Sequence, residues 1–201
     1  MTRLSVLSAV AVFVPCLCAR GGVLLDYGYE ESFNDAAIVR GDGDPSGAFG
    51  FGQFQSFDVT GAAWRIDHVT AHLRLWDVAS EGLAEVAVYA ADGMLPDLSG
   101  PIAPAATVLV DSMTTGAFTV DLGGVVLGPG TYYIGLTASD PGSNLLWMPG
   151  VAAAAHHAVR SDGRVFTYYN PSLSLTLGGE VVPAPAGLIA LAGFGVFRRR
   201  R

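Results

Sequence analysis

The chain has 201 residues and a mass of 20.8 kDa, of which 51% are hydrophobic and only 14% charged, so it is sized for one domain. This composition is too apolar for a disordered chain, and its 26 glycines count against a helical bundle, where each glycine costs about 1 kcal/mol. All eleven basic residues are arginines. Five of these arginines and all eighteen acidic residues lie between the two ends of the sequence, so this middle part carries a formal charge of −13. Such a charge repels phosphate backbones and excludes nucleic-acid partners.

The first 22 residues have the layout of a secretory signal peptide. Arg3 precedes an apolar run at residues 4–14, Pro15 ends it, and small residues follow. A run of about eleven residues is too short to span a bilayer, so we expect a signal helix that signal peptidase removes. Cleavage after Cys18, Ala19 or Gly21 fits equally well. Pro15 and Leu17 fit a lipoprotein signal poorly, and a body cut free of both cysteines forms no disulfide.

Residues 23–180 show short β-rich runs separated by Gly- and Pro-containing turns, among them Gly123-Gly124 and Pro129-Gly130. The clearest run is 65–76, where apolar and polar residues alternate with the period of a half-buried strand. The other expected strands are 49–59, 85–90, 107–111, 117–122, 131–138, 145–148, 165–169 and 173–177. The pattern predicts an all-β fold of two packed antiparallel sheets, a sandwich of jelly-roll or immunoglobulin-like form, with a barrel as the alternative.

Signatures of catalysis and metal binding are missing from the body, and we expect no cofactor, no metal site and no enzymatic activity. His68 and His72 lie four apart on one strand, about 13 Å, too far to share an ion. The adjacent His156 and His157 suit a solvated loop. A hydrolase using Asp67 and Asp77 has no support from position.

Two binding activities remain as alternatives. Calcium would need the oxygen ligands of glycine-rich turns, supplied by Asp42, Asp44, Asp140 and Asn144, although turns favour these residues in any case. A carbohydrate surface would need exposed aromatic rings. A disulfide-free core also needs large aromatics, and we favour that use for the candidates Trp64, Trp76, Trp147, Tyr168 and Tyr169.

Residues 181–201 form a second expected targeting segment. We call it and the signal peptide at 1–22 the two address segments. Pro183-Ala184-Pro185 precedes twelve apolar residues, 186–197, and the chain ends in Arg198, Arg199, Arg200 and Arg201. As a helix the apolar stretch is about 18 Å long, against about 30 Å of hydrocarbon, so it would hold the chain in the membrane only temporarily. The arginine cluster stays cytoplasmic by the positive-inside rule, so the body faces outward.

These three parts, in this order and at the C-terminus, resemble the PEP-CTERM sorting signal of Gram-negative bacteria. The resemblance implies that an exosortase, a membrane cysteine transpeptidase, recognises Pro183, Ala184 and Pro185 and removes the tail. The family's central Glu is Ala184 here, a departure from the full motif. It also implies that the chain is a substrate of the enzyme.

The body resembles the choice-of-anchor extracellular modules that often carry this tail. The similarity lies in 86–93, a strand that ends in an acidic turn, and in 127–136, a Pro-Gly turn followed by an aromatic strand. Pro129 fixes the turn, and Tyr132 or Tyr133 then enters the core.

Together these features predict an exported, non-enzymatic protein, held in the inner membrane transiently and then delivered to the cell surface or extracellular matrix. We expect three segments: a signal peptide at 1–22, an extracytoplasmic β-sandwich at 23–180 and a sorting signal with a short hydrophobic helix at 181–201. Expected partners are signal peptidase and an exosortase, with a surface polysaccharide as a further candidate. A carbohydrate- or calcium-binding module is the alternative function.

Overall fold

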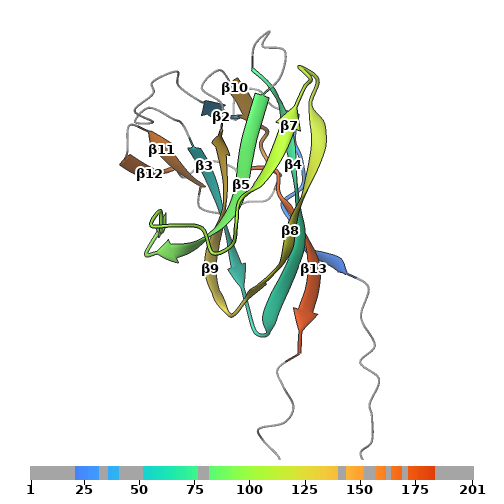
Figure 1. Ribbon diagram of the computed structural model, residues 1–201, viewed down its shortest axis with the longest axis vertical. Helices are drawn as coiled ribbons and strands as arrows, with labels where there is room; N and C mark the ends of the chain where they lie inside the picture. The colour runs from blue at the N-terminus through green and yellow to red at the C-terminus, as the bar shows by residue number, and fades with distance from the viewer. Residues whose placement is uncertain are drawn as a thin grey trace, which may run out of the picture.

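The computed structural model describes residues 21–31, 36–40, 52–76, 82–139, 144–151, 157–161, 164–168 and 172–183. Over these residues the fold is all-β: thirteen strands and no helix. The expected signal helix and C-terminal helix lie outside the described residues. The strands form two antiparallel sheets that pack face to face (Figure 1). This agrees with the sandwich predicted from the turn-separated strands.

The first sheet is organised around one long strand, β4 (Ala63–Leu75). Strand β8 (Gly116–Leu127) pairs with one edge of β4 along most of its length. The other edge is shared by β13 (Thr176–Val182) and β10 (Asn144–Trp147), and these pair in turn with β1 (Gly22–Asp26) and β2 (Ala37–Arg40). One strand therefore connects the two ends of this sheet, about 40 Å apart at the usual rise per residue.

The second sheet is organised around β9 (Gly130–Ala138), which lies between β3 (Gly52–Val59) and β5 (Gly82–Asp92). Beyond β3 come two five-residue strands, β11 (His157–Ser161) and β12 (Arg164–Tyr168). Beyond β5 come β7 (Ala106–Val110) and the two-residue β6 (Leu95–Pro96). The two ends of β5 thus have different partners on its outer edge.

Two short connections carry the chain from one sheet to the other. Strand β3 continues into β4 through residues 60–62, and β8 continues into β9 through residues 128–129. Because β3 pairs with β9 and β4 pairs with β8, the two connections lie side by side at one end of the sandwich. We call this end the base; Pro129, the expected turn residue, lies in it.

The core is made by the inward faces of both sheets. In β4 the expected alternation is confirmed: Val69, Ala71, Leu73 and Leu75 are buried, whereas the residues between them are exposed or half-buried. Among the aromatic candidates, Trp147 is fully buried, and Tyr133 is buried in a smaller cluster with Phe54 and Ala158. Burial of this apolar surface is the main stabilising force, as expected for a body without disulfides.

The segment 172–175 differs from expectation. Residues 173–177 were predicted to be one strand, but β13 begins only at Thr176, and the preceding residues are buried outside any strand. Their backbone bonds go elsewhere: Leu173 N–H donates to Gln55 Oε1 at 2.6 Å, and Ser174 O accepts the Trp147 indole N–H at 2.7 Å. Together with backbone bonds to Tyr27, Met148 and Gly150, side chains of both sheets therefore take the place of a regular ladder here.

Two expected breaks in the chain are strands instead. Gly123 and Gly124 were predicted to form a turn, but β8 continues through them as a bulge, with φ of 70° and 76°. His157, expected in a loop, begins β11, where its backbone pairs with Gln55 and Tyr168. His156 lies outside the described residues. Strands β1, β2, β6 and β11 were not predicted, because each is short and lacks a clear period of two.

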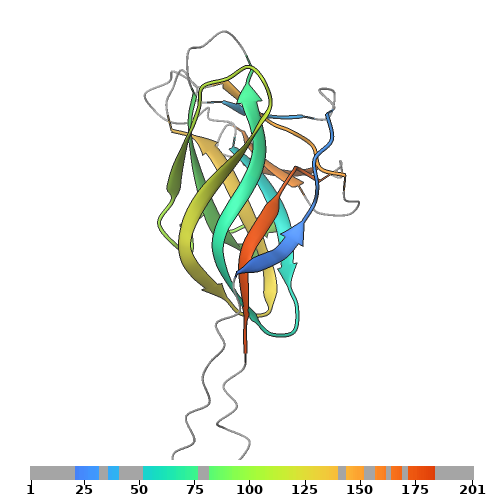
Figure 2. The same ribbon diagram turned by 90° about the vertical axis from the view of Figure 1, so that its right-hand side faces the viewer.

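Strands β1 and β13 place the two ends of the folded body at the base. Gly22 pairs with Gly179, and Val182 at the end of β13 pairs with Ala63. Figure 2 shows the start of β1 beside β13, with the end of β13 extending beyond it toward the base. Strand β1 starts at Gly22 and β13 ends at Val182, so these two strands reach slightly beyond residues 23–180.

Candidate functional site

The junction between body and tail is the first candidate site. Of the expected sorting motif, Pro183 is described: it is exposed and follows Val182, the last residue of β13. Ala184, Pro185 and the arginines at 198–201 lie outside the described residues. Beyond Gly179, β13 pairs with β4 alone, because β1 covers only Thr176 to Gly179. The motif therefore starts one residue beyond a strand end that is held on one side only.

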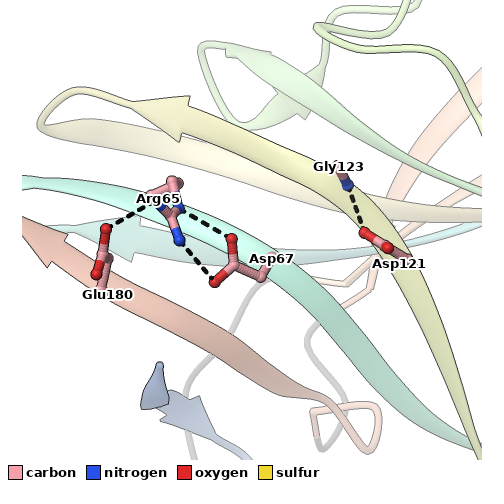
Figure 3. Close-up of polar contacts among 5 residues, drawn as sticks. All are labelled: Arg65, Asp67, Asp121, Gly123 and Glu180. Atoms are coloured by element: carbon pink, nitrogen blue, oxygen red, sulfur yellow. Dashed lines mark hydrogen bonds and ion pairs between the residues drawn. The ribbon is translucent and has the colours of Figure 1, made fainter. Parts of the chain in front are cut away.

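A polar cluster lies next to this junction, where the ladder on both sides of β4 is irregular. Asp67 has no register partner, since the pairing of β4 shifts there against both β8 and β13. On β8, Asp121 Oδ1 accepts a hydrogen bond from Gly123 N–H at 2.7 Å and so stabilises the bulge. The two irregularities turn acidic side chains of neighbouring strands to the same outer face (Figure 3).

Arg65 links two acidic side chains, Asp67 of its own strand and Glu180 of β13. Its Nε donates to Asp67 Oδ1 at 3.0 Å, and its Nη1 lies 2.9 Å from Glu180 Oε1 (Figure 3). The side chains are 44%, 34% and 24% exposed respectively, so water screens these pairs, and each contributes at most about 1 kcal/mol. The cluster fastens the end of β13 to β4 rather than forming a reaction centre.

Glycines allow the strands to approach closely at this point. A Cβ at Gly179 would overlap the backbone carbonyl oxygen of Arg65, and a Cβ at Gly178 would overlap the imidazole of His68. Backbone atoms cannot rotate away as a flexible side chain can, so residue 179 must be glycine for β13 to keep its register with β4. The sequence does not reveal this requirement, because it depends on where Arg65 of the neighbouring strand lies in the folded body.

The histidines of β4 lie apart from one another. His68 is exposed and lies over Gly178, whereas the His72 ring stacks on Tyr29 with centroids 4.3 Å apart. Burial lowers the pKa of His72, and the nearby Asp26 carboxylate partly opposes this effect. Across the described ranges no group of three His, Cys, Asp or Glu side chains could hold a metal ion.

The proposed calcium and hydrolase residues are only partly within the described chain. Asn144 is the first residue of β10, while Asp42, Asp44, Asp77 and Asp140 lie outside the described residues. Asp67 is paired with Arg65, as above.

The aromatic candidates fall into three environments. Trp147 belongs to the core, and Trp64 is half-buried against it. Trp76 is 52% exposed just after β4, at the end opposite the base. Nothing is described of the side chain of Tyr168 or of Tyr169. Of the candidates whose side chains the structure describes, Trp76 is therefore the one with an exposed ring.

The described part of the chain contains an internal void and an open hollow. One is a void of about 10 Å³ inside the core, lined only by apolar side chains and too small for a ligand. The other is an open, mostly apolar hollow of about 540 Å³ between residues 102–106 and the bulged part of β8, with Asp121 as its one charged group. Neither brings together an acid, a base and a nucleophile.

The two phenols near Asp58 are held neutral. The Tyr27 hydroxyl donates to Ser56 O at 3.0 Å, and burial, with a smaller effect of Asp58, raises the pKa of Tyr27 to about 12. The same causes raise the pKa of Tyr133, whose hydroxyl donates to Met94 O at 2.6 Å. Both groups therefore act as hydrogen-bond donors that fix the packing.

No described protein family and no curated protein matches this chain. Within the described ranges, no helix is long and apolar enough to cross a membrane.

Proposed function

We propose that the chain is an exported, non-enzymatic surface or extracellular-matrix protein, sorted by an exosortase through its C-terminal tail. The observation that carries this proposal is the place where the two address segments join the body. Gly22 and Val182 lie at the same end of the sandwich, and the buried hydrophobic residues described all lie between Ala37 and Leu177. Both segments can therefore be removed without opening the core.

The N-terminal junction is compatible with each of the three expected cleavage points. A cut after Cys18, Ala19 or Gly21 leaves Gly22 in place, and with it the whole of β1. Signal peptidase would then free a body whose cysteines have both been removed. Such a body is suited to an oxidising compartment, because it has no thiol to oxidise.

The C-terminal junction supports the second processing step. The exposed Pro183 directly follows the end of β13, so the first residue of the proposed motif is outside the core, and in the sequence the motif directly precedes the proposed membrane-directed stretch. While the tail is inserted the body faces outward; when an exosortase cuts near Pro183, Ala184 and Pro185, the body is released to the surface. There it acts as a structural component, with a surface polysaccharide as its proposed partner.

The finer form of the fold belongs to the same proposal. The ribbon of β3 and β4 pairs along its length with the ribbon of β8 and β9, and both cross between sheets at the base. We take this as a jelly roll rather than an immunoglobulin-like sandwich. Strand β9, which follows the turn at Pro129 and carries the buried Tyr133, is the aromatic strand in which we propose the resemblance to the choice-of-anchor modules.

The experiment compares two double-proline variants in a host that encodes an exosortase. Pro183→Ala with Pro185→Ala removes the proposed motif, and Pro101→Ala with Pro104→Ala, at exposed positions before β7, is the matched control. We expect the tail variant to accumulate uncut in the inner membrane, while the control is released like the unmodified chain. Release of the tail variant at the normal rate would refute recognition by this motif.

A further inference from the structure

The base of the sandwich differs in charge from the rest of the body. It consists of the connection at 60–62, the connection at 128–129 together with Gly130 at the start of β9, and residues 181–183, the end of β13 with Pro183; these three stretches contain no charged residue. Most of their residues are exposed, including Val181 at 53%. A body with a charge of −13 thus presents an uncharged end where its address segments begin.

The charged groups nearest the base are already satisfied. Glu180 is paired with Arg65 at 2.9 Å, and Asp58 accepts a hydrogen bond from the Thr131 hydroxyl at 2.6 Å. Glu180 directly precedes the stretch 181–183, and Asp58 lies two residues before the stretch 60–62. Because Arg65 also pairs with Asp67, these groups and Asp58 together carry a formal charge of −2, so contact with lipid headgroups is limited to the uncharged residues of the base itself.

The length of chain after the body limits how far the base can be from a membrane. Pro183 is the last described residue, and the apolar stretch starts at residue 186, three residues later. Three residues span at most about 11 Å when fully extended. The headgroup layer on one side of a bilayer is about 5–8 Å thick, so a gap of only a few ångströms is possible.

The shortness of the apolar stretch reduces this gap further. A helix of twelve residues is about 18 Å long, so it falls about 12 Å short of the hydrocarbon core. With the four arginines held on the far side, the mismatch is met by thinning of the bilayer, by snorkelling of the arginines or by drawing residues 183–185 inward. Drawing these residues inward brings the base against the headgroups.

We propose that the base is a membrane-contacting surface, pressed onto the lipid headgroups for as long as the tail is inserted. The inference rests on the proposed function, since it requires insertion of the tail. It adds the orientation of the body: the sandwich stands upright, with β4 directed away from the bilayer. The far end, with Trp76 and Thr114, then lies about 40 Å from the headgroups at the usual strand rise.

A pair of labelled variants tests this orientation. Thr60→Cys places a fluorophore on the base, and Thr114→Cys, in the exposed connection between β7 and β8, places it at the opposite end. Cys16 and Cys18 are replaced by Ala in both. The chains are purified from membranes, leader removal is checked by mass, and each is reconstituted in vesicles of equal phosphatidylcholine and phosphatidylglycerol that carry a headgroup quencher.

We expect several-fold stronger quenching at position 60 than at position 114. Equal quenching at both positions would overturn the inference. A Gly/Ser linker of twelve residues after Val182 should lower quenching at 60 to the level at 114; unchanged quenching would show that the short tether does not cause the contact. Vesicle flotation separates the two proposals, because a chain that does not float refutes tail insertion itself.

Discussion

The substitution Gly179→Ala tests how β13 is held against β4. The added Cβ would overlap the carbonyl oxygen of Arg65, and this atom belongs to the backbone of the central strand of its sheet. To relieve the overlap, β13 must move away from β4 near Glu180, or β4 must bend. Overpacking of this kind costs about 1–3 kcal/mol, and loss of the pairs beyond residue 179 adds to it, so we expect about 2–3 kcal/mol.

The assay is urea unfolding of the body, residues 22–183, followed by tryptophan fluorescence. With a slope of about 2 kcal/mol per molar urea, the midpoint should fall by about 1–1.5 M. Gly128→Ala is the matched control: no atom lies within 4 Å of the added Cβ and its φ is ordinary, so its stability should change by less than about 0.5 kcal/mol. A Gly179→Ala midpoint equal to that of the control would refute the close packing of these strands.

Three further predictions concern buried polar groups. Trp147→Phe leaves Ser174 O without its indole donor inside the core and should cost about 2–4 kcal/mol in urea unfolding. Burial lowers the pKa of His72 in the folded state, so stability should fall as pH drops below about 6.5, where the unfolded chain binds the proton first. His72→Gln should therefore reduce the change in melting temperature between pH 7.5 and 5.5. An unchanged dependence of melting temperature on pH would contradict this. Tyr27→Phe should lower stability by about 1 kcal/mol, and the pH titration of phenolate absorbance in the folded body should lose the phenol whose pKa is about 12. Loss of a phenol with an ordinary pKa near 10 would be evidence against burial of Tyr27.

The sequence pattern predicts the parts of this fold whose strands are long and buried on one face. In β4 buried and half-buried residues alternate without a break from Val69 to Leu75, so both the strand and its buried face could be predicted. Strands β1 and β2 could not, because each has only four or five residues and is defined by its partner. Gly22, for example, is a strand residue because Gly179 lies opposite it.

The errors have physical causes of the same kind. Gly123-Gly124 is a common turn sequence, but here the Asp121 carboxylate and the neighbouring β4 hold it as a bulge within a strand. Residues 173–175 have the composition of a strand, yet a buried Gln55 amide on the other sheet accepts the Leu173 N–H. Both outcomes depend on residues far away in the sequence, and local propensity carries no information about them.

The candidate site is predictable in part. The order of motif, apolar stretch and arginine cluster can be read directly from residues 181–201, whereas the closeness of the two junctions depends on the pairing of β1 with β13. The role of Gly179 and the pairing of Arg65 with Glu180 follow only from the three-dimensional arrangement of β13 on β4.

The most direct test of the central claim is the intact mass of the protein recovered from the cell surface. The account predicts the mass of a chain that begins within residues 19–22 and ends near residues 183–185, with the folded body complete between these ends. A surface form that retains Arg198, Arg199, Arg200 and Arg201 together with the first eighteen residues would contradict it.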